Sequence, residues 1–126
     1  MTELIISFTV DGIHFWPNAP EQYEEFSHPH RHLFKFICWY PQKDSQDPTR
    51  RKTELWKLRQ DTIYKIFKLW NNGNAERWAE EAEPSAFSKI NFGPASCEGI
   101  AQTIKDKLGF SKVFCGEDDF FGAIVS

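Results

Sequence analysis

The sequence predicts an α+β fold, in which helices cover one face of a four-stranded antiparallel sheet. Two early segments alternate apolar and polar residues as half-buried strands do, and two later segments repeat apolar residues at helical spacing. Two further short apolar segments, separated by a turn, end the chain. The expected order is therefore strand, strand, helix, helix, strand, strand, within a single domain over residues 1–126.

The composition limits the classes of protein to which the chain can belong. Its 126 residues suit one domain, and its formal net charge of -3 gives no general attraction for nucleic acid or membrane. No apolar run is long enough to span a bilayer, and the first residues lack the pattern of a signal peptide. The three cysteines have no paired spacing, which indicates a reducing compartment. We therefore expect a cytoplasmic protein with no nucleic-acid or membrane partner.

The first predicted strand covers residues 3–10, in the sequence ELIISFTV. Its apolar residues occupy every second position from Leu4 to Val10, and the prolines of the following WPNAP segment cannot donate to a ladder. The second strand runs from about residue 30 to 40. It carries apolar residues on both faces, which is typical of a strand that is covered on both sides.

The period then changes to that of a helix. Apolar residues at helical spacing begin after Thr53, a candidate N-cap, and the sequence NNGN ends the helix near Asn71. A short acidic helix is expected at residues 75–83. The segment from residue 85 to 96, SAFSKINFGPAS, is expected to be an irregular loop.

The last helix begins after Ser96, a candidate N-cap, and runs to about Leu108, where Gly109 closes it. Two short strands, KVFCGE and FFGAIV, end the chain on either side of Asp118 and Asp119, which are expected to be turn residues. A sheet of four strands leaves two edges exposed, and such edges invite pairing with another chain.

Four short motifs occur in order along these elements. The first strand ends FTVDGIH, the second begins HRH, the last helix opens PASCEGIA, and the strand after it ends VFCGED. This series resembles the 6-pyruvoyl-tetrahydropterin synthase and 6-carboxy-tetrahydropterin synthase family. The family's motifs, in the same order, are F-x-x-x-x-x-H, H-G-H, P-T-x-E-N-x-A and V-x-x-E-T. The resemblance covers most of the chain and implies a tunnelling fold.

The resemblance implies a zinc ion held by His14, His30 and His32. The geometry of strands agrees, because histidines two positions apart point to the same face and a paired strand can supply the third. Three imidazoles with a fourth position open to water or substrate are typical of catalytic zinc. The alternative is a pair of surface histidines beside a proline turn. His28 lies outside the motif, and we expect it beside the ligands or in solvent.

The resemblance also implies a glutamate that holds the N–H edge of a pterin or purine ring, which corresponds here to Glu117. A carboxylate can accept two parallel hydrogen bonds from such an edge. Glu98 corresponds to the glutamate of the helix motif, although an acidic residue there also simply favours the helix dipole. Phe15 and Trp16 can stack on a planar heterocycle, while core packing or a subunit contact explains them equally well.

Two parts of the family's proton relay are missing. The family's synthases abstract a proton with a cysteine a few residues before H-G-H, whereas the first cysteine of this chain is Cys38. The family's Asp-His pair after the first long helix is also missing, because no histidine follows His32. Proton transfer still needs a positioned acid or base, for which His28, Cys97 and Glu98 are candidates. Cys97 is otherwise a small buried residue.

The resemblance implies a lyase of the pterin synthase type, which acts on a pterin or on a deazapurine precursor of the kind used in queuosine biosynthesis. The missing relay leaves open a non-catalytic alternative, in which the same pocket captures a purine or nucleotide as a sensor or sequestering protein. A third possibility is a structural oligomer in which the histidines are incidental. The resemblance further implies a homo-trimer or homo-hexamer whose sheets close into a barrel, with sites between subunits.

Overall fold

The fold is that of a computed structural model, which describes residues 2–42, 48–70 and 90–126. The elements, in chain order, are β1 (Thr2–His14), the 3-10 helix η1 (Glu21–Ser27), β2 (His30–Gln42), α1 (Pro48–Trp70), β3 (Ile90–Gly93), α3 (Cys97–Leu108), β4 (Lys112–Glu117) and β5 (Phe121–Val125). The α+β class is confirmed. The acidic helix expected at residues 75–83 lies outside the described residues.

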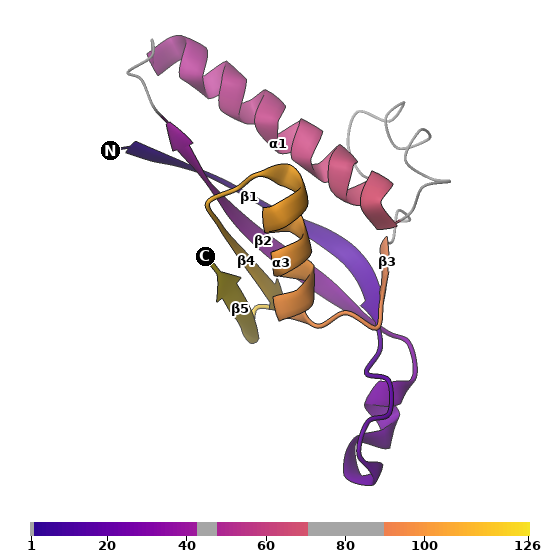
Figure 1. The fold of residues 1–126 in the computed structure, drawn as a ribbon. Helices are drawn as coiled ribbons and strands as arrows, with labels where there is room; N and C mark the ends of the chain where they lie inside the picture. Colours follow the sequence, from indigo (N-terminus) through magenta and orange to yellow (C-terminus); the bar gives the residue numbers. More distant parts are fainter. Residues whose placement is uncertain (1, 43–47, 71–89) are drawn as a thin grey trace.

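The sheet has five strands in the order β3-β1-β2-β4-β5, so the expectation of four antiparallel strands is wrong. The fifth strand, β3, comes from the segment that was expected to be a loop, and it runs parallel to the end of β1 (Figure 1). The other neighbouring pairs are antiparallel. Four residues are too few to show a strand period, although Ile90 and Phe92 alternate toward the core as a strand requires.

The helices lie on one face of the sheet, as expected. In Figure 1, α1 crosses β1 and β3, whereas α3 packs against β4 and β5. Along the middle of β1 and β2 every second residue is buried beneath them, which confirms the alternation in the sequence there. The fully buried side chains of this core are Phe34, Phe36, Cys38, Ile63, Ile66, Phe67, Ile90, Ile100, Ile104, Val113 and Cys115.

The long β1–β2 pair sets the position of the histidines. Its register runs without interruption from Thr2 opposite Gln42 to His14 opposite His30. Near its end, Gly12 lets two aromatic rings close against β1, because a Cβ there would lie 2.6 Å from the ring of Phe92 and 2.7 Å from that of Phe34. Strand β1 continues past Val10 to His14, whose ring packs edge-on against Phe34 at a centroid distance of 5.2 Å.

The helix ends agree in part with the sequence. Helix α3 begins as expected, since the Ser96 hydroxyl accepts from the Gly99 amide at 3.1 Å, and Gly109 closes it in the left-handed conformation at φ 75. Helix α1 begins at Pro48 rather than after Thr53. Proline suits a first helical turn because its missing N–H has no partner there in any case.

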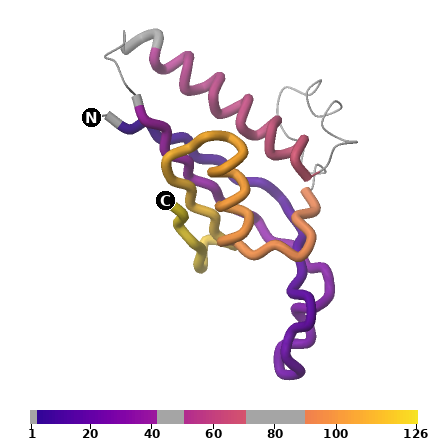
Figure 2. The backbone as a smooth tube through the Cα atoms, viewed as in Figure 1, coloured from indigo at the N-terminus to yellow at the C-terminus, as the bar shows by residue number. Residues whose placement is uncertain are grey.

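A segment between β1 and β2, which contains η1, extends beyond the end of the sheet (Figure 2). None of the residues of η1 is buried. The five described strands form an open sheet, and β3 and β5 are its two edge strands. Among the helices that the structure describes, none combines the length and the apolar character that crossing a bilayer requires.

Candidate metal centre and its pocket

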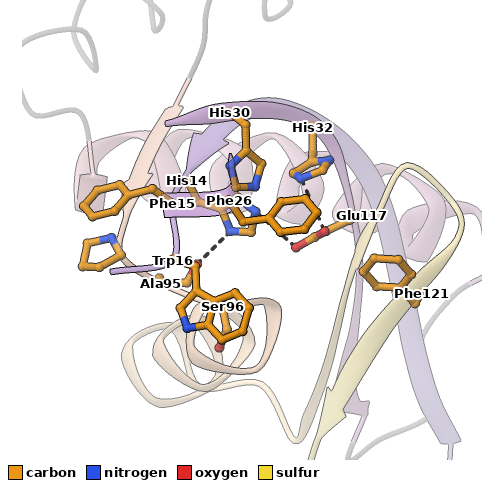
Figure 3. A pocket seen from close by; sticks show the side chains of 11 residues that line it. His14, Phe15, Trp16, Phe26, His30, His32, Ala95, Ser96, Glu117 and Phe121 are labelled. Carbon is orange, nitrogen blue, oxygen red and sulfur yellow. Dashed lines mark hydrogen bonds and ion pairs between the residues drawn. The ribbon is translucent and has the colours of Figure 1, made fainter. Parts of the chain in front are cut away.

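Three imidazoles converge at one end of the sheet. His14 is the last residue of β1, while His30 and His32 open the neighbouring strand β2 on the same face. The ring centroids lie 4.6 Å apart for His14 and His30, 5.0 Å for His14 and His32, and 4.9 Å for His30 and His32. One nitrogen from each ring lies within 4.8 Å of the other two, so the cluster can hold a metal ion. Figure 3 shows the three rings turned toward one another.

The second nitrogen of each imidazole, Nδ1, lies at hydrogen-bond distance from an oxygen of the protein. The acceptors are the Ala95 carbonyl for His14 at 2.9 Å, the His28 carbonyl for His30 at 2.9 Å, and the Asp118 carboxylate for His32 at 2.6 Å. A carbonyl or carboxylate oxygen only accepts, so Nδ1 carries the proton in each ring. The lone pair is thus left on Nε2, as in metal sites whose ligating histidines donate their other N–H to an oxygen.

The Nε2 atom of His14 is buried and makes no hydrogen bond. Glu117 Oε1 lies 3.3 Å from it, which is an ion-pair distance without hydrogen-bond alignment. A buried polar atom without a partner costs about 1–3 kcal/mol, and a metal ion would remove that cost. Burial is the main cause that lowers the pKa of His14, which favours the neutral imidazole that a metal ligand must be.

The carboxylate of Glu117 lies beside two of the three histidines. Its Oε1 atom accepts a hydrogen bond from the Cys97 thiol at 3.4 Å, and its Oε2 atom lies 3.5 Å from Nε2 of His32. Together with the contact to His14, the carboxylate touches three groups at once. A negative charge at this place can offset the charge of a bound cation, and its position at the end of β4 brings it to the cavity.

The histidines and Glu117 form one side of a cavity of about 370 Å³. Aromatic side chains form much of the rest: Phe15, Trp16, Phe26 and Phe121. Phe15 and Trp16 directly follow β1, Phe26 belongs to η1 and Phe121 begins β5. A cavity with few polar groups and several aromatic rings is suited to a small planar ligand.

The remaining candidates from the sequence lie in different places. Trp16 lines the cavity and is 46% exposed. The side chain of His28 is exposed, and only its carbonyl takes part in the site. Glu98 is exposed on α3 and is not among the residues that line the cavity. Cys97 is buried behind Glu117 and hydrogen-bonded to it.

The three cysteines are free thiols in the core. Burial raises the pKa of the Cys38 thiol to about 12. The contact with Cys97, followed by burial, raises the pKa of the Cys115 thiol far above its ordinary value. Cys38 and Cys115 therefore stay protonated at neutral pH and behave as small apolar residues.

Sequence reasoning missed several residues of the site. Asp118 was expected only to turn the chain, which it does at φ 50, but its carboxylate also holds His32. That contact and the Leu33 backbone N–H keep the pKa of Asp118 below its usual range. Phe26 and Phe121 were missed because no motif contains them, and Ala95 was missed because it acts through its backbone carbonyl, which its side chain does not indicate. The one available signal was the aspartate that directly follows Glu117.

Comparison with known proteins adds little beyond the fold. Neither the scan of family models nor the search of curated proteins gives a match. Among solved structures, the chain is similar to the uncharacterized protein WS1659 from Wolinella succinogenes, with a TM-score of 0.51 and 13% sequence identity. The similarity covers 98% of this chain and 97% of that protein. At this identity it supports the overall fold and nothing finer.

Proposed function

We propose that this chain is a zinc-dependent enzyme of the pterin synthase type, which acts on a pterin or on a purine-derived substrate. The observation that carries the proposal is the arrangement of the three histidines. Their Nδ1 atoms face fixed oxygens, and one nitrogen from each ring meets the others within 4.8 Å at the side of the cavity. Zinc is the metal that best matches three neutral imidazoles in a site with an open position.

His14, His30 and His32 are the ligands in this proposal. A zinc ion held in this way supplies a Lewis acid that polarises an oxygen of the substrate side chain. The hydrogen bonds from Nδ1 keep the rings oriented, and the carboxylate of Glu117 lies close enough to balance the added charge. The orphaned Nε2 atom of His14 supports this assignment, because it has no other hydrogen-bond partner.

The substrate ring lies among the aromatic side chains in this proposal. Trp16 and Phe26 are partly exposed at the cavity and offer faces for stacking. Glu117 accepts hydrogen bonds from the N–H edge of the ring, once the two histidine nitrogens beside it are taken up by the metal. Glu98 has no part in this step, because it lies outside the cavity lining.

A second candidate is capture of a purine or nucleotide without turnover. Among the described residues that line the cavity, the ionisable side chains are the three histidines and Glu117. The histidines bind the metal in this proposal, and His28 is not among the residues that line the cavity. The acid or base for proton transfer would therefore be Glu117, which accepts a hydrogen bond from the Cys97 thiol. This small number of acids and bases at the cavity is the observation that keeps a sensor or sequestering protein as the second candidate.

We also propose that copies of the chain assemble into a trimer or a hexamer in the cytoplasm. The edge strands β3 and β5 are open, and Phe120, Phe121 and Ile124 near one edge are 82%, 68% and 61% exposed. Phe121 also lines the cavity, so a neighbour that covers this edge would border the site. The three free thiols support a reducing compartment.

Metal analysis and turnover assays test the proposal. Purified protein should contain about one zinc per chain, measured by elemental mass spectrometry. It is then incubated with dihydroneopterin triphosphate and, separately, with guanine nucleotides, and the mixtures are examined by mass spectrometry. New products would support the enzyme, and a retained but unchanged ligand would support capture. A protein that binds neither zinc nor heterocycle would refute both candidates.

A further inference from the structure

The carboxylate of Asp118 reaches two adjacent residues of β2. Its Oδ2 atom lies 2.6 Å from Nδ1 of His32, and its Oδ1 atom accepts from the Leu33 amide at 2.8 Å. The backbone amide of Asp118 also donates to the Leu33 carbonyl at 2.9 Å. Three contacts therefore join the turn between β4 and β5 to the strand that carries two of the metal ligands.

The turn holds Asp118 in the left-handed backbone conformation. Asp118 and Asp119 both have positive φ, at 50 and 62, which few residues other than glycine, asparagine and aspartate adopt readily. The pairing of Glu117 with Phe34 in the β2–β4 ladder fixes where this turn begins. The position of the carboxylate is thus set by the turn and by its contacts with the Leu33 backbone, and His32 Nδ1 lies 2.6 Å from it.

We propose that Asp118 is the positioning residue of the metal centre, which holds His32 with its proton on Nδ1 and turns Nε2 toward the ion. The inference rests on the proposed metal site. His14 and His30 face neutral carbonyls, whereas His32 faces a charged acceptor at a shorter distance. A carboxylate in this place makes the imidazole a stronger donor to a metal, and loss of such a partner typically costs about 10–100-fold in metal affinity.

Asparagine is an informative replacement because both contacts of Asp118 require an acceptor. An asparagine side chain has one oxygen and one NH₂ group, so it can satisfy only one of the two. If the NH₂ group faces His32, it donates to Nδ1 and moves the imidazole proton to Nε2, where it blocks the metal. If the oxygen faces His32, the contact survives without its charge, and the NH₂ group opposes the Leu33 amide.

The adjacent residue supplies the matched control. Asp119 belongs to the same turn and also has positive φ, but its side chain is 76% exposed and its carboxylate lies 3.9 Å from Lys35 Nζ. Asp119→Asn therefore makes the same chemical change one position away, without touching a histidine. Zinc affinity is measured by competition with a chromophoric chelator. We expect about a 10–100-fold loss for Asp118→Asn and no change for Asp119→Asn.

A second measurement reads the tautomer directly in the wild-type chain. Long-range ¹H–¹⁵N NMR of metal-free protein with labelled histidine should show His32 protonated at Nδ1. A proton on Nε2 of His32 would overturn the inference, and so would unchanged zinc affinity in Asp118→Asn. Failure of the wild-type chain to bind zinc would instead overturn the proposed function, while the NMR result would still decide whether Asp118 holds His32.

Discussion

His14 and His30 lie directly opposite each other at the end of the β1–β2 ladder, with their ring centroids 4.6 Å apart. Residues directly opposite in an antiparallel pair bring their side chains together on one face. The second histidine of the H-x-H pair, His32, lies on the same face two residues further along β2. A three-histidine cluster is therefore built into the pairing of two strands, and it does not depend on a flexible loop.

Replacing any one ligand should remove the metal. Alanine at His14, His30 or His32 is expected to lower zinc affinity by more than the roughly 100-fold that loss of an outer partner can cause. Zinc content after purification, measured by elemental mass spectrometry, checks this. His28→Ala is the control, because His28 acts through its carbonyl, which the substitution keeps. Loss of zinc from the control as well would mean that the cluster has been misassigned.

Glu117→Gln should separate ligand binding from metal binding. Glutamine cannot accept two hydrogen bonds from a ring edge with a full negative charge, and such bonds are worth about 1.5–3 kcal/mol, or about 10–150-fold in affinity. Isothermal titration with the heterocycle identified by mass spectrometry measures the loss, and zinc content should stay at the wild-type level. Glu98→Gln should behave as wild type, because Glu98 does not line the cavity. Loss of zinc in Glu117→Gln would show instead that the Glu117 carboxylate is needed to hold the metal.

Gly12→Ala should destabilise the chain beside the metal centre. The added Cβ would lie 2.6 Å from the Phe92 ring and 2.7 Å from the Phe34 ring, and overpacking of this kind typically costs about 1–3 kcal/mol. Urea unfolding of the metal-free protein measures the change. Gly99→Ala in α3 should be neutral or stabilising, because its Cβ would meet only the Ser96 hydroxyl at 3.5 Å. Equal stability of the two variants would contradict the close packing of the Phe34 and Phe92 rings against Gly12.

Alkaline pH should destabilise the fold through Cys38. The pKa of this thiol is raised to about 12 in the folded chain from an ordinary value of 9.0, so the unfolded chain loses the proton first. Its contribution to stability is complete below pH 9.0 and decreases as the pH rises toward 12, by about 1.4 kcal/mol per pH unit. Urea unfolding at about pH 8, 9 and 10, on either side of the ordinary value of 9.0 where the loss begins, should show a shallower loss in Cys38→Ala.

Val113→Ala is the control for the Cys38 variant. Val113 lies opposite Cys38 in the β2–β4 ladder and is also fully buried, but it does not titrate. Its substitution should lower stability at every pH and leave the slope above pH 9.0 unchanged. A slope that is the same in wild type and in Cys38→Ala would show that this thiol does not govern the alkaline loss.

Local patterns in the sequence were sufficient for most of the elements. The alternation in β1, the stripe in α1 and the caps of α3 depend on near neighbours, so each could be recognised without the fold. The strand β3 could not, because four residues have too little period and their partner lies far back in the chain. The start of α1 was placed too late because a proline at a first helical turn resembles the end of a loop.

The sequence by itself determined which side chains can ligate a metal, because the spacing of His30 and His32 on a strand places both on one face. Only the tertiary structure decided what holds those side chains in place. Ala95 lies 81 residues from His14 along the chain, and Asp118 lies 86 residues from His32, yet each pair makes a hydrogen bond. Such contacts depend on the register of strands that are distant in sequence. No local period encodes that register, since it follows from how the whole sheet buries its apolar face.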